Sequence, residues 1–188
     1  MRIIGGEARG RTLVAPAGMA TRPTQDYVRE SLFNILMPFL SEARVLDLFA
    51  GTGALSLEAI SRGAASAVLC DRDHAALSCI RRNVAAVRCE DRVRIFSGEW
   101  NACLRSLQGQ SFDLVFLDPP YRMDNTGEMC GFMMDLGLLA DGFRIVVEHR
   151  AGTPPRPDSR FQIYNCRHYG DTEISFLRLA SQPMEADP

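Results

Sequence analysis

The sequence predicts a single α/β domain built on a seven-stranded, mainly parallel sheet that ends in an antiparallel hairpin. From residue 44 onward, short apolar runs alternate with helical patterns, which is typical of a parallel sheet covered by helices on both faces. The last two apolar runs are joined only by RHYGD, which is too short for a helical crossover. A length of 188 residues suits one core, and we find no internal repeat.

Two segments precede the sheet. Residues 1–23 hold short apolar stretches around a glycine-rich turn, so we expect a small basic hairpin there. Residues 24–36 place apolar side chains near helical spacing, and Thr24 follows Pro23 and precedes an acidic turn, so Thr24 is the expected helix cap. We therefore expect one domain over residues 1–188, with a hairpin extension over 1–23 and a catalytic core over 24–179.

The core continues as alternating strands and helices. Strands are expected over residues 44–49, 66–71, 92–96, 112–118 and 143–149, with helices over 54–61, 73–87, 100–107 and 127–138. Two further strands over 161–166 and 172–179 should form the hairpin, after a loop over 151–160. The polar tail over 180–188 is expected to lack fixed structure. Five β/α units followed by a hairpin is the element order of class I methyltransferases, the Rossmann-like enzymes that use S-adenosyl-L-methionine (SAM).

Composition argues against several classes of protein. No apolar run approaches the roughly 18 residues that span a bilayer, and the first residues lack a secretory signal. The six cysteines show no CxxC pair and no zinc-ligand spacing, so we expect reduced, mostly buried thiols and no metal. We expect a cytoplasmic monomer without contact to a membrane. Three histidines stand apart in the sequence without a nucleophile or metal partner: His74, His149 and His168.

The charge is small and unevenly distributed. The formal net charge is -2, so the whole molecule is not a general polyanion binder. Residues 1–40 carry five arginines and three acids, which gives this end +2. All 21 basic residues are arginine. Either the planar guanidinium is used to grip phosphate oxygens, or codon bias across the genome has replaced lysine.

A glycine turn follows the first strand in the segment VLDLFAGTGALSLEA, residues 45–59. Gly51 and Gly53 let the backbone approach a ligand closely and leave amide donors at the start of a helix. Asp47 lies in the strand before the turn, where its carboxylate can meet an ammonium group. This combination favours a cofactor that carries an amino acid over one that carries a pyrophosphate.

An acid also ends the second strand. Asp71 stands 20 residues after Gly51, where a carboxylate accepts hydrogen bonds from ribose hydroxyls. That position fits NAD as well as SAM, because the same turn approximates the dinucleotide fingerprint. Asp73 has the alternative role of capping the following helix. Glu99, after the third strand, either accepts from an adenine amino group or starts the next helix.

The fourth strand ends in LDPPY, residues 117–121. Two prolines remove two backbone donors, and the carboxylate needs partners or water. This strand end is expected beside the end of the first strand, in the crevice where open α/β sheets bind ligands. Asp118 and the Pro119 carbonyl would then accept the two hydrogens of an exocyclic amine, in a geometry held by the prolines. Tyr121 would stack on the base.

This arrangement predicts methyl transfer to an exocyclic amine. Acceptors that pull the amine hydrogens toward a tetrahedral arrangement localise the nitrogen lone pair, and the sulfonium methyl supplies the electrophile. The alternative is a proline-terminated strand with a buried tyrosine. The predicted catalytic residues are Asp118, Pro119, Pro120 and Tyr121.

On these residues the chain resembles the RsmD family, the 16S rRNA guanine-N2 methyltransferases. The resemblance runs from RIIGGEARGR through RPTQDYVRESLFNIL, VLDLFAGTGALSLEA, VLCDRD and FLDPPY to HYGDTEISFLR. DPPY alone is less specific, because several DNA adenine-N6 methyltransferases carry the same four residues.

The resemblance implies SAM as cofactor and 16S rRNA, or the assembling 30S subunit, as partner. It implies that Thr24 and Arg29 help bind the methionine end of the cofactor. Glu7 and Glu173 depart from the family pattern, in which neutral or basic residues are expected. The predicted cofactor set is Thr24, Arg29, Asp47, Phe49, Gly51, Gly53, Asp71, Arg72, Glu99 and Asp118, and the predicted RNA contacts are Arg2, Arg9, Arg11 and Arg22.

Three other functions fit parts of the sequence. A DNA adenine-N6 methyltransferase usually needs an insertion that reads bases in the groove, and no segment of sufficient size is left for one. An NAD-dependent oxidoreductase would use the glycine turn and Asp71. A non-catalytic RNA or ribosome-assembly binder would keep the fold, but the intact DPPY argues against it.

Overall fold

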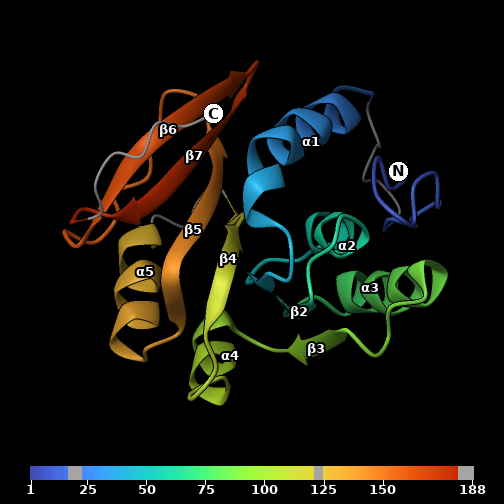
Figure 1. Ribbon diagram of the computed structural model, residues 1–188, viewed down its shortest axis with the longest axis horizontal. Coiled ribbons are helices and arrows are strands. Elements are labelled where there is room, and N and C mark those ends of the chain that lie inside the picture. The colour runs from blue at the N-terminus through green and yellow to red at the C-terminus, as the bar shows by residue number, and fades with distance from the viewer. Residues whose placement is uncertain (17–22, 121–124, 182–188) are drawn as a thin grey trace.

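The computed structural model describes residues 1–16, 23–120 and 125–181, and the side chains of residues 23–25 fall outside this description. A seven-stranded sheet lies between two layers of helices (Figure 1). The strands are β1 Arg44–Asp47, β2 Ser66–Asp71, β3 Val93–Ser97, β4 Phe112–Leu117, β5 Leu139–Arg150, β6 Phe161–Tyr169 and β7 Thr172–Leu179.

The sheet has the predicted topology. The strand order is β3-β2-β1-β4-β5-β7-β6. The first five strands of this order pair in parallel, whereas β7 pairs antiparallel with both β5 and β6. The connection between β6 and β7 is the two-residue turn Gly170–Asp171, and the ladder continues up to the pair Tyr169 and Thr172. Gly170 has a φ of 65°, which favours glycine.

Helices cover both faces. One face carries α1 Pro23–Leu36, α2 Ala54–Ser61 and α3 His74–Val87, and a short 3-10 helix, η1 Met37–Phe39, follows α1. The other face carries α4 Trp100–Ser106 and α5 Thr126–Asp135 (Figure 1). Trp100 is 8% exposed and belongs to the second core, where it meets Phe132 edge-on. Among the described residues no helix is long and apolar enough to cross a membrane.

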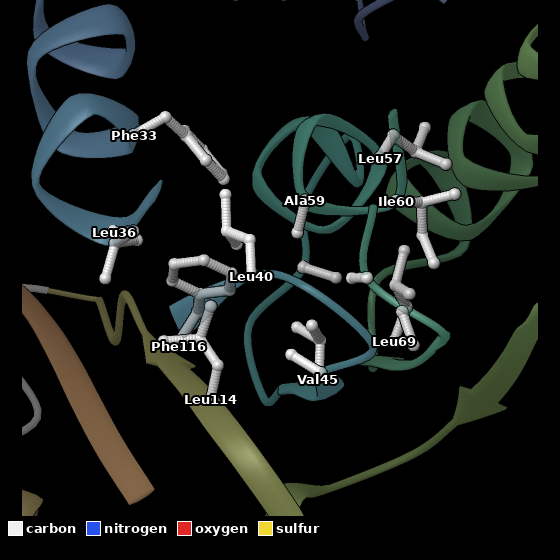
Figure 2. Packing of buried hydrophobic residues seen from close by; sticks show 14 of the residues in the cluster. Phe33, Leu36, Leu40, Val45, Leu57, Ala59, Ile60, Leu69, Leu114 and Phe116 are labelled. Atoms are coloured by element: carbon white, nitrogen blue, oxygen red, sulfur yellow. The ribbon is translucent and has the colours of Figure 1, made fainter. Parts of the chain in front are cut away.

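The first core is built from aromatic and branched side chains of α1, α2 and the central strands. Figure 2 shows Phe33 and Leu36 of α1 together with Leu114 and Phe116 of β4. The rings of Phe33 and Phe116 have centroids 6.1 Å apart. Each fully buried side chain of this kind contributes about 1.5–3 kcal/mol by leaving water. This packing fixes α1 over the ends of the central strands, where a site could form.

Several element boundaries differ from the prediction: α5 ends at Asp135 and not at residue 138, β1 ends at Asp47 and not at residue 49, and β6 ends at Tyr169 and not at residue 166. Two further differences have a clear physical cause. Helix α1 begins at Pro23, so Thr24 lies inside the helix and is not the residue that precedes it. Proline suits the first helical turn because its φ is already fixed and its missing N–H has no partner there anyway. Strand β5 begins at Leu139, earlier than expected, because Leu139 pairs with Phe112 at the start of β4.

The expected hairpin at the amino-terminal end is present as a single antiparallel bridge between Arg2 and Thr12. It docks on α2, since the Glu58 carboxylate accepts from the backbone N–H groups of Ile4 and Gly5, each at 2.7 Å. Asn83 of α3 holds the segment that follows, accepting from the N–H of residue 14 at 2.7 Å and donating to its carbonyl at 2.9 Å. The hairpin is therefore attached to the same helix that starts at the glycine turn.

Candidate active site

A pocket of about 560 Å³ opens at the carboxyl ends of β1, β4 and β5. It brings together five of the predicted site residues, from α1, β1, the glycine turn and the end of β4. Sequence reasoning missed the contribution of β5 and of the β6–β7 turn. The lining includes Val28, Arg29, Leu32, Asp47, Phe49, Gly51, Thr52, Asp118, Glu148, Tyr169, Gly170, Asp171 and Thr172.

The glycine turn needs its two glycines for different reasons. Gly51 and Gly53 have φ angles of 54° and 77°, in the region that favours glycine. A Cβ added at Gly53 would lie 2.9 Å from Cδ2 of Leu69 in the core. A Cβ at Gly51 would meet no atom within 4 Å. Gly53 is thus required by packing, whereas Gly51 leaves open space on the pocket wall.

This difference predicts that alanine at the two positions lowers the free energy of unfolding by different amounts. We expect Gly53→Ala to lower the free energy of unfolding by about 2–4 kcal/mol, because a strained backbone and an overpacked core add together. Gly51→Ala should cost only about 1 kcal/mol, from backbone conformation alone. Urea unfolding of both variants measures the difference, and equal losses would contradict the packing role of Gly53.

Asp47 lies on the floor of the pocket. Its side chain is 2% exposed and accepts a hydrogen bond from Ser56 Oγ at 2.9 Å. Burial raises the pKa of Asp47 to about 7, although hydrogen bonds from Ser56 and the Phe49 backbone oppose the rise. A buried carboxyl of this kind favours a cationic ligand group, because the cation restores the stabilisation that water no longer provides.

Arg29 of α1 also lines the pocket. The residue is 5% exposed, and Nη2 donates to Asp26 Oδ1 at 3.0 Å and to the Arg2 carbonyl at 2.5 Å. Nε is buried without a hydrogen bond to any described residue and lies 3.7 Å from Glu58 Oε2. Burial lowers the pKa of Arg29. The predicted contact of Arg29 with the methionine end of the cofactor stays a prediction. The side chain of Thr24, its predicted companion, falls outside the described residues.

Asp71, at the end of β2, holds the glycine turn through hydrogen bonds. Asp71 accepts from the N–H of Gly51 at 2.8 Å and from the N–H of Asp73 at 2.9 Å. Each carboxylate oxygen can accept a second hydrogen bond, so a contact with a ribose stays a prediction. Asp73 caps α3 by accepting from the N–H of Ala76 at 2.9 Å, which confirms the alternative role for that residue.

Arg72 and Glu99 lie beyond the pocket lining. They form an exposed ion pair, with Arg72 Nη1 3.0 Å from Glu99 Oε1, at the ends of β2 and β3. Glu99 is the N-cap residue of α4, but its side chain makes no capping hydrogen bond. The place of Glu99 therefore agrees with a helix start, and its predicted contact with adenine stays a prediction.

Asp118 follows the last residue of β4, at the predicted place. It is exposed to the open pocket, yet protein surrounds its carboxyl on most sides. Burial, together with the charges of Glu148 and Asp47, raises the pKa of Asp118 well above its ordinary value. Pro119 is buried and Pro120 is exposed, whereas Tyr121 and Arg22 lie outside the described residues.

Glu148 was not predicted. It lies near the end of β5, lines the pocket, and has a pKa raised by burial. A signal was present in the sequence, because FRIVVEH places an acid at the end of an apolar strand just as FDLVFLD does. Neither the side chain of Asp118 nor that of Glu148 makes a hydrogen bond or an ion pair with another described residue.

Two of the three histidines lie close to each other's partner in the folded chain, although they are separated in the sequence. His149 and His168 both approach Glu173, at 3.8 Å and 3.0 Å. Donor atoms of His149, Cys166 and Glu173 lie within 4.8 Å of one another. Nε2 of His149 already has a hydrogen bond with Ser175 at 2.8 Å, so cross-strand hydrogen bonding accounts for the cluster. Five of the six cysteines are buried and all six are free, as expected.

Comparison with known proteins gives a consistent result. The family model described as conserved hypothetical protein 95 matches residues 1–178. The Ribosomal RNA small subunit methyltransferase D of Escherichia coli strain K12 is 41% identical over 159 residues, which is 84% of this chain and 79% of that protein. The protein of the same name from Haemophilus influenzae is 33% identical over 156 residues, covering 82% and 81% of the two chains.

Solved structures agree with the fold. The Escherichia coli protein yhhF superimposes with a TM-score of 0.83 at 36% identity, covering 97% of this chain and 99% of that one. The protein SMU.776, solved in complex with SAH, gives a TM-score of 0.68 at 12% identity over 84% of this chain and 50% of that one. At that identity the likeness concerns the fold alone.

Proposed function

The chain belongs to the RsmD family, and we propose that it transfers the methyl group of SAM to the exocyclic N2 amine of a guanine in the 16S rRNA of the small ribosomal subunit. One observation carries the proposal. Asp47 and Gly51 of the predicted cofactor site and Asp118 of the predicted amine site line the same pocket. A cofactor and an acceptor amine could therefore meet there.

The residues present fit SAM. Asp47 is a buried carboxyl suited to the amino group of the cofactor, and Arg29 lines the same pocket, where its guanidinium would meet the methionine end of the cofactor. Gly51 leaves open space on the pocket wall, and Asp71 fixes the turn on the side expected for the ribose. When bound, SAM supplies an electrophilic methyl group. The proposed cofactor set is completed by Thr24, Phe49, Gly53, Arg72, Glu99 and Asp118.

The proposed catalytic role of the protein is to orient the amine. The Asp118 carboxylate and the Pro119 carbonyl accept the two amine hydrogens, and the carboxylate stabilises positive charge that develops on nitrogen. Pro120 restricts the backbone, and Tyr121 stacks on the base. We propose that this happens in one domain over residues 1–188, in a cytoplasmic monomer that needs no metal.

Incubation with labelled SAM tests this function. Purified protein is given 16S rRNA, either naked or in 30S particles, and the product is digested and mapped by mass spectrometry. We expect N2-methylguanosine at one position. Absence of label from rRNA, or label on the N6 of an adenine, would contradict the proposal. Protection against thermal unfolding by S-adenosylhomocysteine, but not by NADH, separates the cofactor assignment from an oxidoreductase.

The proposed RNA contacts are on the amino-terminal hairpin. Arg2, Arg9 and Arg11 are exposed there. Glu7, the acid that departs from the family pattern, forms an ion pair with Arg92, so its charge is balanced within the protein. Arg2 is paired in the same way with Asp26, at 3.5 Å, so Arg9 and Arg11 are the hairpin arginines without an ion-pair partner among the described residues.

The exposed arginines of the hairpin predict that RNA binding depends on salt concentration. We expect the double variant Arg9→Gln, Arg11→Gln to weaken RNA binding and to lower the slope of log K against log salt by about 0.7–0.9 for each phosphate that is no longer neutralised. The KM for RNA should rise while kcat is kept. Filter binding over a range of salt concentrations measures the slope. Arg105→Gln, which removes one exposed arginine on α4 at the other face, is the control, and an equal effect for each charge removed would show that only net charge matters.

A further inference from the structure

Three carboxyl groups form a staggered row across neighbouring strand ends: Asp47 on β1, Asp118 after β4 and Glu148 on β5. The last pair between β4 and β5 is Leu117 with Val147, so the next residues, Asp118 and Glu148, lie opposite each other. Adjacent strands are about 4.8 Å apart. Figure 1 shows β4 and β5 side by side, with β7 next to β5.

Asp118 and Glu148 lie on the same face of the sheet. Side chains alternate between the two faces, and Phe116 and Val146, two residues earlier, both pack in the core beneath α1. Glu148 pairs on its other side with Ile174 of β7, which also lines the pocket. Both carboxyls therefore open into the pocket that also holds the glycine turn.

The three carboxyl groups have more oxygen atoms that can accept hydrogen bonds than the described residues have donors for them. Asp47 accepts from Ser56 and suits a ligand ammonium, and Asp118 suits an amine. The side chain of Glu148 has no hydrogen bond or ion pair with a described residue, and its neighbour Asp118 is another acid and offers it no cation. A half-buried carboxylate in this position needs a donor, which is water while the pocket is open and a group of the bound ligand once that water is displaced.

Glu148 also connects two cavities. A second cavity of about 560 Å³ lies on the far side of Pro119 and Pro120, with Thr126, Arg150 and Pro155 in its wall. Among the described residues, Glu148 alone lines both cavities. A base that has left its stack could reach the end of β4 from this side, with its edge between Asp118 and Glu148.

We propose that Glu148 recognises the Watson–Crick edge of the target guanine, with its carboxylate accepting a hydrogen bond from N1–H while Asp118 and Pro119 hold the adjacent N2 amine. This rests on the proposed function. Guanine presents a donor at N1 beside its amine, whereas adenine presents a lone pair at N1 beside its amine. A carboxylate attracts the first and repels the second. Glu148 therefore selects guanine at a site whose DPPY residues would accept the amine of either base.

The test uses a base that differs from guanine at this edge. 2-Aminopurine keeps the amine at C2, but its N1 is an acceptor and it lacks the 6-oxygen. First the nucleotide that the wild-type protein methylates is mapped in 16S rRNA. RNA carrying guanine or 2-aminopurine at that nucleotide is then given to wild-type protein and to Glu148→Gln, Glu148→Asp and Glu90→Gln. Glu90 is an exposed acid after α3 and serves as the matched control.

We expect Glu148→Gln to lower kcat/KM for guanine by roughly 10-fold, because the amide oxygen can still accept from N1–H but carries no charge. The preference for guanine over 2-aminopurine should narrow at least tenfold, because a glutamine amide can donate to the N1 of 2-aminopurine. Glu148→Asp, which keeps a carboxylate, should retain the preference. Glu90→Gln should match the wild type, and the affinity for S-adenosylhomocysteine should stay within twofold in every variant.

Two results would overturn this assignment. An unchanged preference in Glu148→Gln would show that the carboxylate does not read the base. A loss of S-adenosylhomocysteine affinity in that variant would place Glu148 on the cofactor instead. Failure of the wild-type protein to methylate 16S rRNA is a different result, because it removes the proposed function itself before any variant is compared.

Discussion

Replacement of Asp118 by alanine is expected to lower kcat for methyl transfer by about 10³-fold, the size of effect seen when a positioned charge or proton acceptor is removed. The alanine removes the acceptor that orients the amine and the charge that stabilises the developing cation. Asp118→Asn should fall between the wild type and alanine, because the amide oxygen still accepts one hydrogen bond but carries no charge. Single-turnover rates with labelled SAM measure the effect.

The control for this prediction is cofactor binding. S-adenosylhomocysteine should bind Asp118→Ala about as tightly as it binds the wild type, because Asp47, Arg29 and Gly51 are unchanged. Methylation at the wild-type rate by Asp118→Ala would refute the proposed chemistry and favour a protein that keeps the fold for binding alone. Loss of cofactor affinity together with rate would show that Asp118 acts chiefly through its other predicted role, in cofactor binding.

The raised pKa of Asp118 adds a prediction for stability. A carboxyl whose pKa is higher in the folded protein than in the unfolded chain favours folding at low pH, and this contribution is lost as the pH rises through the raised value. Asp118→Asn should therefore raise the melting temperature at pH 8 relative to the wild type, and the difference should disappear near pH 4. A constant difference at both pH values would point to packing instead of charge.

Replacement of Glu58 by alanine is expected to lower the free energy of unfolding by about 3–5 kcal/mol. Glu58 is fully buried and accepts from the N–H groups of Ile4 and Gly5 and from Arg62 Nε, each at 2.7 Å. Arg29 Nε lies 3.7 Å away. Without the carboxylate, two backbone donors lose their partners and two arginines lose a neighbouring negative charge. Urea unfolding measures the loss.

An exposed ion pair provides the comparison. Asp113 pairs with Arg44 at 3.0 Å, but the two side chains are 34% and 45% exposed. Asp113→Ala should cost no more than about 1 kcal/mol, because water and salt screen the pair. Equal losses in the two variants would show that the burial of Glu58 does not matter. In Glu58→Ala we also expect faster proteolysis within residues 1–16, since the hairpin is no longer held on α2.

The sequence predicted the sheet well because local signals specify its elements. Glycine and proline mark the ends of apolar runs, and alternating strands and helices leave little freedom in topology. The start of β5 was wrong because pairing between Leu139 and Phe112 decides it, and no local pattern shows that contact. The start of α1 was wrong because two adjacent residues, Pro23 and Thr24, both suit a helix start.

The same holds for the candidate site: some of its residues could be predicted from the sequence and others could not. Asp47, Gly51 and Asp118 could be predicted because strand order places the ends of β1 and β4 side by side. Glu58 could not, because its backbone partners are more than 50 positions away and its sequence context is that of an ordinary helical residue. Glu7 and Glu173 look like misplaced charges until the fold brings them to Arg92 and to the histidines of β5 and β6.

The turn between β6 and β7 gives the fold a way to diversify. Because β7 runs against its neighbours, Gly170 and Asp171 reach the pocket rim, and the ladder is complete right up to them. Residues inserted there would lengthen the rim without shifting the register of any strand. Insertions at this turn could therefore change which nucleic acids reach one edge of the pocket. The part of the site built on β1 and β2 would stay the same.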